Sequence, residues 1–285
     1  MANLISVVGS AGSGKSTSIQ YLNPEETFVI AVTKKDLPFS GTATEYTKYH
    51  PKDNPTGNHY TTHRASDLIK LLSMINKRKE IKYVVVDDIQ YLMGKQAMER
   101  SKEKNFDKHV DIASDYNAVI EKALSLRDDL YVFTLTHADV ESDRDGNVIS
   151  AKIKTLGHML DKVVTVDGLY TWNLWCEKLV DVDDEGNEVT YHVFKTNDPS
   201  GKSTCKTPHG AFEDIYIPNS LQLVVEAIEA YRKRPRELAP LVKIPAHLNR
   251  KVGSKLPSKN KVEDVAEPIE EVKVEKSELD EDDDL

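Results

Sequence analysis

A glycine-rich stretch, GSAGSGKST from Gly9 to Thr17, directly follows the apolar run LISVV and restricts the fold more than any other part of the chain. Its spacing, Gly9-x-x-x-x-Gly14-Lys15-Ser16, is the complete phosphate-loop pattern, which about one chain of this length in a hundred would contain by chance. A phosphate loop needs a strand before it and a helix after it. We therefore predict a buried strand in NLISVV and a helix in SGKSTSIQYL.

The residue types in this loop suit a nucleoside triphosphate. Gly9, Gly12 and Gly14 allow the backbone to turn successive N–H groups toward one anion. Lys15 would reach the β- and γ-phosphates, and the Ser16 hydroxyl would ligate Mg²⁺. An ordinary Gly/Ser-rich turn is the weaker alternative, because the flanking segments fit a phosphate loop. The predicted cofactors are ATP and Mg²⁺, and the predicted nucleotide-binding residues are Gly9, Ser10, Ala11, Gly12, Ser13, Gly14, Lys15, Ser16 and Thr17.

Two acids follow the run YVVV, which is apolar without alternation, as in a parallel strand buried on both faces. Ligands bind at the carboxyl ends of such strands. Asp87 is therefore predicted to be the acid on the magnesium side, acting through water, with Ser16 as the other metal-side residue. Asp88 is predicted to orient or deprotonate the attacking water. A helix cap or a solvated turn residue is an equally good interpretation of Asp88.

Thr136 and His137 end another predicted strand, LYVFTLTH. Polar side chains at this edge would contact the γ-phosphate and report its loss to the rest of the fold. The alternative is a plain transition from strand to loop. We favour the functional interpretation, because both residues follow an otherwise apolar strand.

Strand and helix patterns alternate along most of the chain and end in a hairpin, which predicts an α/β fold. We expect a mostly parallel sheet, helices on both faces and a C-terminal antiparallel hairpin. Loops are expected at residues 34–63 and from Asp139 to Thr155, and helices at Ala65–Lys79 (capped by Ser66), at Phe106–Leu126 and after Asn219 or Ser220. Further strands are expected at TFVIAVT and KVVTVDG, and the hairpin in TWNLWCEKLVDV-DDEGN-EVTYHVFKT.

Charge divides the chain into three parts. Residues 232–261 hold ten Lys/Arg and one Glu, a net charge of +9, whereas residues 262–285 hold twelve Asp/Glu and two Lys, a net charge of −10. Blocks of like charge with few aromatic residues are typical of disordered segments. The predicted organisation is an ATPase domain at 1–231, a basic flexible linker at 232–261 and an acidic disordered tail at 262–285.

The order of several motifs resembles a known family. The general arrangement is similar to P-loop ATPases that place an extra strand between the phosphate-loop strand and the Asp strand, which include RecA-type and AAA-type enzymes. DDIQYL, LTH, KTLG and IPNSL, in this order, resemble phage-encoded AAA-domain or shortened RecA-core ATP-binding proteins, which are linked to single-strand annealing and recombination. The resemblance covers about residues 3–231. Two positions depart from the pattern, Asp88 in place of a frequent Glu and His158 in place of Lys.

This resemblance implies a RecA-like core, a ring or filament of identical subunits, and single-stranded DNA as a partner. A cation from the adjacent subunit would complete hydrolysis. The candidates are Lys152, Lys154 and His158, with Lys206 as a further one, although each lysine by itself is more simply a surface charge. The basic segment would contact DNA phosphates, or it is a solvated linker. The acidic tail would compete with DNA, or recruit a phage single-strand-binding or recombination protein.

The leading prediction is a Mg²⁺-dependent ATPase that acts on single-stranded DNA in phage recombination or replication. A helicase or helicase loader is one alternative, and a nucleotide-gated DNA-binding scaffold with negligible turnover is another. A small-molecule kinase is disfavoured by the absence of an Arg-rich lid. Cys176 and Cys205 are expected to be reduced thiols. Because no apolar run approaches the roughly 20 residues of a membrane span, we expect the protein in the host cytoplasm and no membrane partner.

Overall fold

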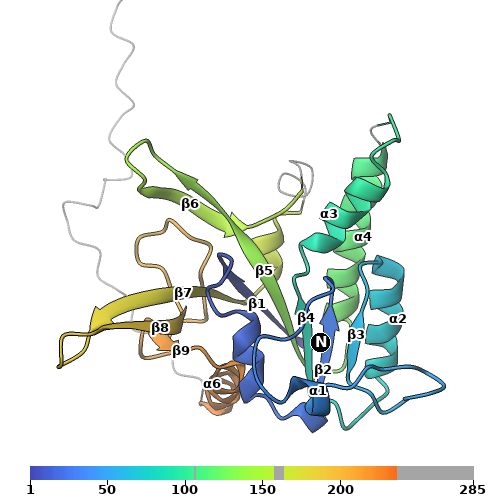
Figure 1. Cartoon of the computed structure of the whole chain (residues 1–285), viewed down its shortest axis with the longest axis horizontal. Coiled ribbons are helices and arrows are strands. Elements are labelled where there is room, and N and C mark those ends of the chain that lie inside the picture. Colours follow the sequence, from blue (N-terminus) through green and yellow to red (C-terminus); the bar gives the residue numbers. More distant parts are fainter. Residues whose placement is uncertain (106, 157–163, 236–285) are drawn as a thin grey trace, which may run out of the picture. The chain divides into compact units, whose positions relative to one another are not determined.

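The computed structural model describes residues 1–105, 107–156 and 164–235. A nine-stranded sheet forms the centre of the compact unit Met1–Pro235. Its strand order is β3-β2-β4-β5-β1-β7-β8-β9, and β6 pairs with the far end of β5 (Figure 1). The strands are β1 Asn3–Gly9, β2 Thr27–Ala31, β3 His59–Thr61, β4 Tyr83–Asp87, β5 Tyr131–Ser142, β6 Val148–Ile153, β7 Trp172–Val182, β8 Glu188–Lys195 and β9 Tyr216–Pro218.

The neighbouring strands in the series β3-β2-β4-β5-β1-β7 run parallel, β8 is antiparallel to both β7 and β9, and β6 is antiparallel to β5. The predicted α/β fold, with a mostly parallel sheet and a late antiparallel hairpin, is therefore confirmed. Strand β5 lies between β1 and β4, as expected for an extra strand between the phosphate loop and the acids. All residues of β1, β2 and β4 are buried, which explains why these segments are apolar without alternation.

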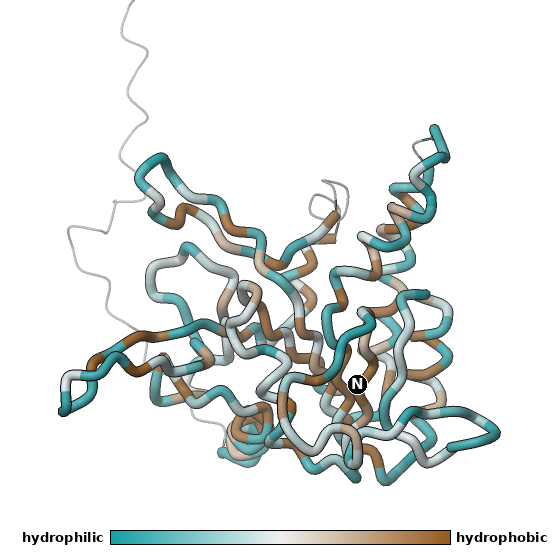
Figure 2. The backbone as a smooth tube through the Cα atoms, viewed as in Figure 1, coloured by the Kyte–Doolittle hydropathy of each residue, from teal (hydrophilic) through white to brown (hydrophobic). Residues whose placement is uncertain are grey.

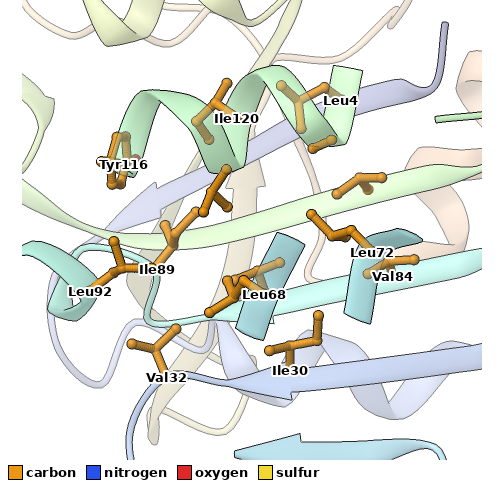
Figure 3. Close-up of a cluster of buried hydrophobic side chains, with 14 of the residues drawn as sticks. Leu4, Ile30, Val32, Leu68, Leu72, Val84, Ile89, Leu92, Tyr116 and Ile120 are labelled. Atoms are coloured by element: carbon orange, nitrogen blue, oxygen red, sulfur yellow. The ribbon is translucent and has the colours of Figure 1, made fainter. Parts of the chain in front are cut away.

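Helices cover both faces of the sheet, as predicted. Side chains of β4 alternate between the two faces, because Val84 and Val86 join one hydrophobic cluster and Val85 joins the other. The first cluster is covered by α2 (Ala65–Ile75), α3 (Tyr91–Glu99) and α4 (Asp107–Leu124), and Figure 3 shows Leu68 and Ile120 within it. The second is covered by α6 (Leu221–Lys233) and the 3₁₀ helix η1 (Ser16–Tyr21).

The segment after the phosphate loop is a 3₁₀ helix of six residues, not the longer helix that we predicted. The later start follows from Gly14, whose φ of 108° is not helical. Pro24 prevents continuation beyond Leu22, because proline lacks an N–H and keeps the preceding residue out of the helical region. Asn23 is accordingly extended, with ψ of 116°. The segment from Pro24 to Glu26 forms a second short 3₁₀ helix, η2.

We predicted a loop at residues 34–63, but this segment also contains the single-turn helix α1 (Thr42–Glu45) and the edge strand β3. Asn58 holds this segment together: its Oδ1 accepts from the Thr47 amide, and its Nδ2 donates to the carbonyls of Pro24 and Glu45. A strand of three residues is too short to show a periodic pattern in the sequence. Helix α3 and strand β9 were likewise not predicted.

The stretch from Asp139 to Thr155 is mostly a β-hairpin, not the predicted loop. Its turn and the turn of the β7–β8 hairpin have the same design, D-x-x-G-N. Asp143 Oδ1 accepts from the Asn147 amide at 2.8 Å, as Asp183 Oδ1 does from the Asn187 amide at 2.8 Å. In Figure 2 both tips are hydrophilic. At the base of the β5–β6 hairpin, Ala151 and Ile153 are buried, and Ile153 joins the hydrophobic cluster that also contains Val84.

One predicted strand and one predicted helix start differ from the structure, and a second helix start agrees with it. KVVTVDG is not a strand where it is described, because Thr165 has a left-handed φ of 51° and Val166–Leu169 forms the 3₁₀ helix η3. Helix α2 begins after Arg64 instead of being capped by Ser66. Ser220 does cap α6, by accepting from the Leu223 amide.

Helix α6 continues through Lys233, into the segment that was predicted to be a linker. The rest of that linker and the acidic tail, residues 236–285, lie outside the described residues and stay predictions. Cys176 and Cys205 are both free and buried, in agreement with the expected thiols. Among the helices that are described, none is both long and apolar enough to cross a membrane.

Replacing Leu68 by alanine should test the packing of the first cluster. Leu68 is fully buried between α2 and the sheet, and truncation of a buried leucine costs about 2–5 kcal/mol of unfolding free energy. The measurement is urea denaturation followed by circular dichroism. Met98→Ala, on the exposed side of α3 with 75% of the side chain accessible, is the control and should change stability by less than about 0.5 kcal/mol. Equal effects would contradict the described packing.

Candidate functional site

The phosphate loop connects β1 to η1 at the carboxyl end of the sheet. Gly12 and Gly14 have positive φ values of 73° and 108°, which glycine adopts without strain. The Lys15 ammonium lies across the loop and donates to the carbonyls of Gly9 at 2.8 Å and Ser10 at 2.9 Å. A cavity of about 540 Å³ opens in front of the loop, and Gly12, Gly14, Lys15, Ser16, Asp88 and His137 are among its lining residues.

Lys15 is buried, and none of the carboxylates in the described part of the chain forms an ion pair with its ammonium. Burial lowers the pKa of Lys15, and the charges of Asp88 and Asp87 only partly oppose this effect. A buried ammonium with carbonyl partners alone is an incompletely neutralised charge. A phosphate anion in the adjoining cavity would supply the missing negative charge.

Ser16 and Asp87, the two predicted metal-side residues, lie together. The Ser16 hydroxyl donates to the Asp87 carboxylate, with distances of 2.9 and 3.0 Å to its two oxygens. Burial raises the pKa of Asp87, because the charged form loses hydration, while Lys35 and the Ser16 hydrogen bond act in the opposite direction. The contact joins residues 71 positions apart in the chain.

The oxygen donors here fit Mg²⁺ that also binds phosphate. Mg²⁺ prefers oxygen ligands, and usually takes one or two from the protein and the rest from phosphate and water. No group of three or more His, Cys, Asp or Glu side chains suited to a metal occurs in residues 1–105, 107–156 and 164–235. Ser16 and Asp87 would therefore hold the ion together with the nucleotide, rather than as an all-protein cage.

Asp88 lies beside the same cavity, in an uncommon backbone conformation with φ of 62°. Its Oδ2 accepts from the Thr33 hydroxyl at 3.1 Å and lies 2.6 Å from the Lys35 ammonium. Burial raises the pKa of Asp88, but the hydrogen bond and charge of Lys35 outweigh it and hold the pKa below the ordinary value. The alternative role as a helix cap is not seen, because Gln90 is the residue that precedes α3.

His137 lines the cavity, and Thr136 is not among the lining residues. The Thr136 hydroxyl is buried and points to the His137 carbonyl at 3.5 Å. His137 Nε2 lies 3.6 Å from Asp88 Oδ1, beyond direct hydrogen bonding. Burial, with the nearby charge of Lys15, lowers the pKa of His137, so that its ring is mostly neutral at pH 7. The His137 amide donates to Gln90 Oε1 at 3.2 Å.

Three residues that the sequence analysis did not assign to the site support the loop from its other side. His192 Nδ1, on β8, lies 2.7 Å from the Ser13 carbonyl oxygen, so this nitrogen carries the proton. Asn219 Nδ2, just after β9, donates to the Gly14 carbonyl at 2.9 Å, and Cys176 Sγ lies 3.3 Å from the Ser13 carbonyl. No local pattern marks these residues, because it is the sheet order that brings β7, β8 and β9 to the loop.

A fourth unpredicted residue, Lys35, follows β2 and lines the same cavity. Its side chain is 41% exposed, yet its ammonium contacts the carboxylates of both Asp87 and Asp88. Burial by itself would lower the pKa of Lys35, but the two acids outweigh it and raise the pKa. Asp88 is thus paired with a lysine that belongs to none of the sequence motifs.

The four residues predicted to act on a neighbouring subunit do not form one cluster among the described residues. Lys154 lines a second cavity, of about 530 Å³, together with Ser10, Ala11 and His137. Lys152 lies on β6 opposite Asp139. Lys206 is paired with Asn173 through backbone hydrogen bonds and is not among the residues that line either cavity. His158 lies outside the described residues.

No protein-family model and no curated protein sequence matches this chain.

Gly9→Ala should distort the loop. A Cβ on Gly9 would lie 2.3 Å from the Cys176 carbonyl oxygen, so the contact between β1 and β7 would have to open. We expect the free energy of unfolding to fall by about 1–3 kcal/mol, which would appear as a lower melting temperature. We also expect weaker binding of a fluorescent ATP analogue. The control is Gly94→Ala in α3, where a Cβ meets nothing within 4 Å and alanine should stabilise the helix by up to about 1 kcal/mol. A harmless Gly9→Ala would refute this close packing.

Proposed function

We propose that this protein binds ATP with Mg²⁺ and hydrolyses it, and that it acts on single-stranded DNA in phage recombination or replication. One observation carries the nucleotide part: the Ser16 hydroxyl and the Asp87 carboxylate are 2.9 Å apart beside the buried Lys15. A hydroxyl, an acid and a lysine at the carboxyl edge of parallel strands are the parts that a P-loop NTPase needs.

The residues of the chain suggest how hydrolysis would proceed. Lys15 would stabilise the negative charge that develops on the transferred phosphoryl group, and Mg²⁺ would neutralise the phosphate oxygens. Asp88 borders the cavity and would orient or deprotonate the attacking water. Lys154, on the side of the loop where Ser10 and His137 line the second cavity, is a candidate to act on the nucleotide of a neighbouring copy, as are Lys152 and His158.

The assignment to DNA rests on other support. The strand order, with β5 between β1 and β4 and an antiparallel hairpin beyond β7, agrees with a RecA-like core. The motifs that resemble phage recombination proteins span this core, and the segment 232–261 carries a net charge of +9, which suits DNA phosphates. A ring or filament and a protein partner for the acidic tail belong to the same proposal.

A second candidate is a nucleotide-gated scaffold that hydrolyses ATP very slowly. It is favoured by the 2.6 Å contact between Lys35 and Asp88. A carboxylate whose pKa is held low by a cation is a weak general base, because proton transfer to it is less favourable. In this case ATP binding would control the affinity for DNA without much turnover.

Phosphate release by the wild type and by Lys15→Ala, each with and without single-stranded DNA, tests the proposal. We expect DNA-stimulated release by the wild type and a loss of about 100-fold or more in Lys15→Ala, because an electrostatic contact to the transition state disappears. Lys34→Ala, which removes an exposed lysine nearby, is the control and should behave as the wild type. Electron microscopy of the same samples should show rings or filaments. Unchanged release by Lys15→Ala would overturn the ATPase assignment.

Asp88→Asn separates the enzyme from the scaffold. If Asp88 handles the attacking water, this variant should retain ATP affinity and lose about 10²–10⁴-fold in phosphate release. ATP affinity is measured by calorimetry and release in single-turnover experiments. If the wild type already releases phosphate as slowly as Asp88→Asn, but its DNA affinity changes when ATP is added, the scaffold is the correct assignment.

A further inference from the structure

The Lys35 ammonium lies among the oxygens that we assign to the magnesium site. Its Nζ is 2.6 Å from Asp88 Oδ2, 3.4 Å from Asp87 Oδ2 and 3.5 Å from Ser16 Oγ. Ser16 and Asp87 are the residues proposed to hold Mg²⁺, and Asp88 is the proposed water-orienting acid. One positive group of the chain is therefore within contact distance of all three.

The segment that carries Lys35 is fixed against the end of β4. The Val32 amide donates to the Asp87 carbonyl at 3.0 Å, and the Thr33 hydroxyl donates to Asp88. The Lys35 amide then turns back to the Thr33 carbonyl at 3.1 Å. Lys95 of α3 donates to the Val32 carbonyl at 3.2 Å, so the turn is held from a second element. Lys35 thus starts from a defined backbone position next to the acids.

The two acids need a cation at this place. The side chains of Asp87 and Asp88 are 1% and 5% exposed, and a buried carboxylate without a partner is costly. Among the described residues, their ion pairs are with Lys35 and, for Asp88, with the mostly neutral His137 at 3.6 Å. Lys15 is engaged with the loop carbonyls instead. Lys35 is therefore the group that neutralises this pair of acids.

We propose that Lys35 is a built-in competitor of the divalent cation at Ser16 and Asp87. This inference rests on the proposed function and describes the regulation of the same site. Lys35 has to leave the carboxylates before a metal ion can bind to them, so the nucleotide-free protein holds metal weakly. Its long side chain, 41% exposed, is able to move toward the solvent or toward a triphosphate in the cavity. Metal and nucleotide would then bind together rather than in sequence.

A different role for Lys35, as a simple phosphate ligand, leads to a different expectation. In that case removal of the ammonium would weaken nucleotide binding at every metal concentration, and would leave metal binding without nucleotide unchanged. Competition instead predicts that removal of the ammonium strengthens metal binding to the nucleotide-free protein. The two roles are therefore separated by measuring metal binding in the absence of ATP.

The experiment titrates Mn²⁺, as a paramagnetic substitute for Mg²⁺, into the nucleotide-free full-length protein and measures free Mn²⁺ by electron paramagnetic resonance. Lys35→Met should bind Mn²⁺ about tenfold or more tightly than the wild type, because a cation next to a carboxylate changes its affinity for a proton by a similar factor. Lys34→Met removes the same charge from an exposed neighbour and should bind as the wild type. The double variant Lys35→Met with Asp87→Asn should lose the gain.

Two further measurements test whether the charge of Lys35 is responsible and whether the variants are folded. Lys35→Arg keeps the positive charge and should bind Mn²⁺ as weakly as the wild type, and circular dichroism melts establish that each variant is folded. Unchanged or weaker Mn²⁺ binding by folded Lys35→Met overturns the inference, and so does a gain that persists in the double variant. None of these readouts involves hydrolysis. A wild type without ATPase activity would defeat the proposed enzyme, whereas a Lys35→Met without gain defeats the competition alone.

Discussion

The contact between Ser16 and Asp87 is the interaction on which the site depends. It connects the phosphate loop, at the end of β1, to the end of β4, across the intervening strand β5. The parallel strands β1 and β4 end at the same edge of the sheet, so η1, which begins with Ser16, can reach the acid at the end of β4. The apolar strands therefore set the distance between the two halves of the proposed nucleotide site.

The charges at this edge form one coupled system. Two buried acids, Asp87 and Asp88, face two lysines, but only Lys35 contacts them, because Lys15 is held by the carbonyls of its own loop. The arrangement neutralises the acids and leaves Lys15 directed toward the cavity. It also explains why one acid has a raised pKa and its neighbour a lowered one: Asp87 is the more deeply buried, whereas Asp88 has the shorter contact to Lys35. Phosphate and metal would enter as a pair of opposite charges, which disturbs this balance least.

The antiparallel end of the sheet also supports the loop that follows β1. His192 and Asn219 hold the carbonyls of Ser13 and Gly14, and Gly9 allows β7 to approach the loop closely. These contacts were not predicted, although Asn219 had been considered as a helix cap. The central strands β1, β2 and β4 were predicted well, because an apolar run buried on both faces is visible in the residues. The β5–β6 hairpin was taken for a loop because of its mixed charges, although Ile149, Ala151 and Ile153 alternate with polar residues in the way that a strand requires.

The order of amino acids alone was sufficient for the phosphate loop, the mostly parallel sheet, the acids after YVVV and the placement of Ser16 with Asp87. These features are local patterns, or follow from the rule that parallel strands present their carboxyl ends at one edge. The positions of Lys35, His192 and Asn219 could not be obtained in this way. Each comes from a separate part of the chain, and only the packing of β2, β8 and the start of α6 around the loop brings their polar atoms within hydrogen-bonding distance of it or of its acids.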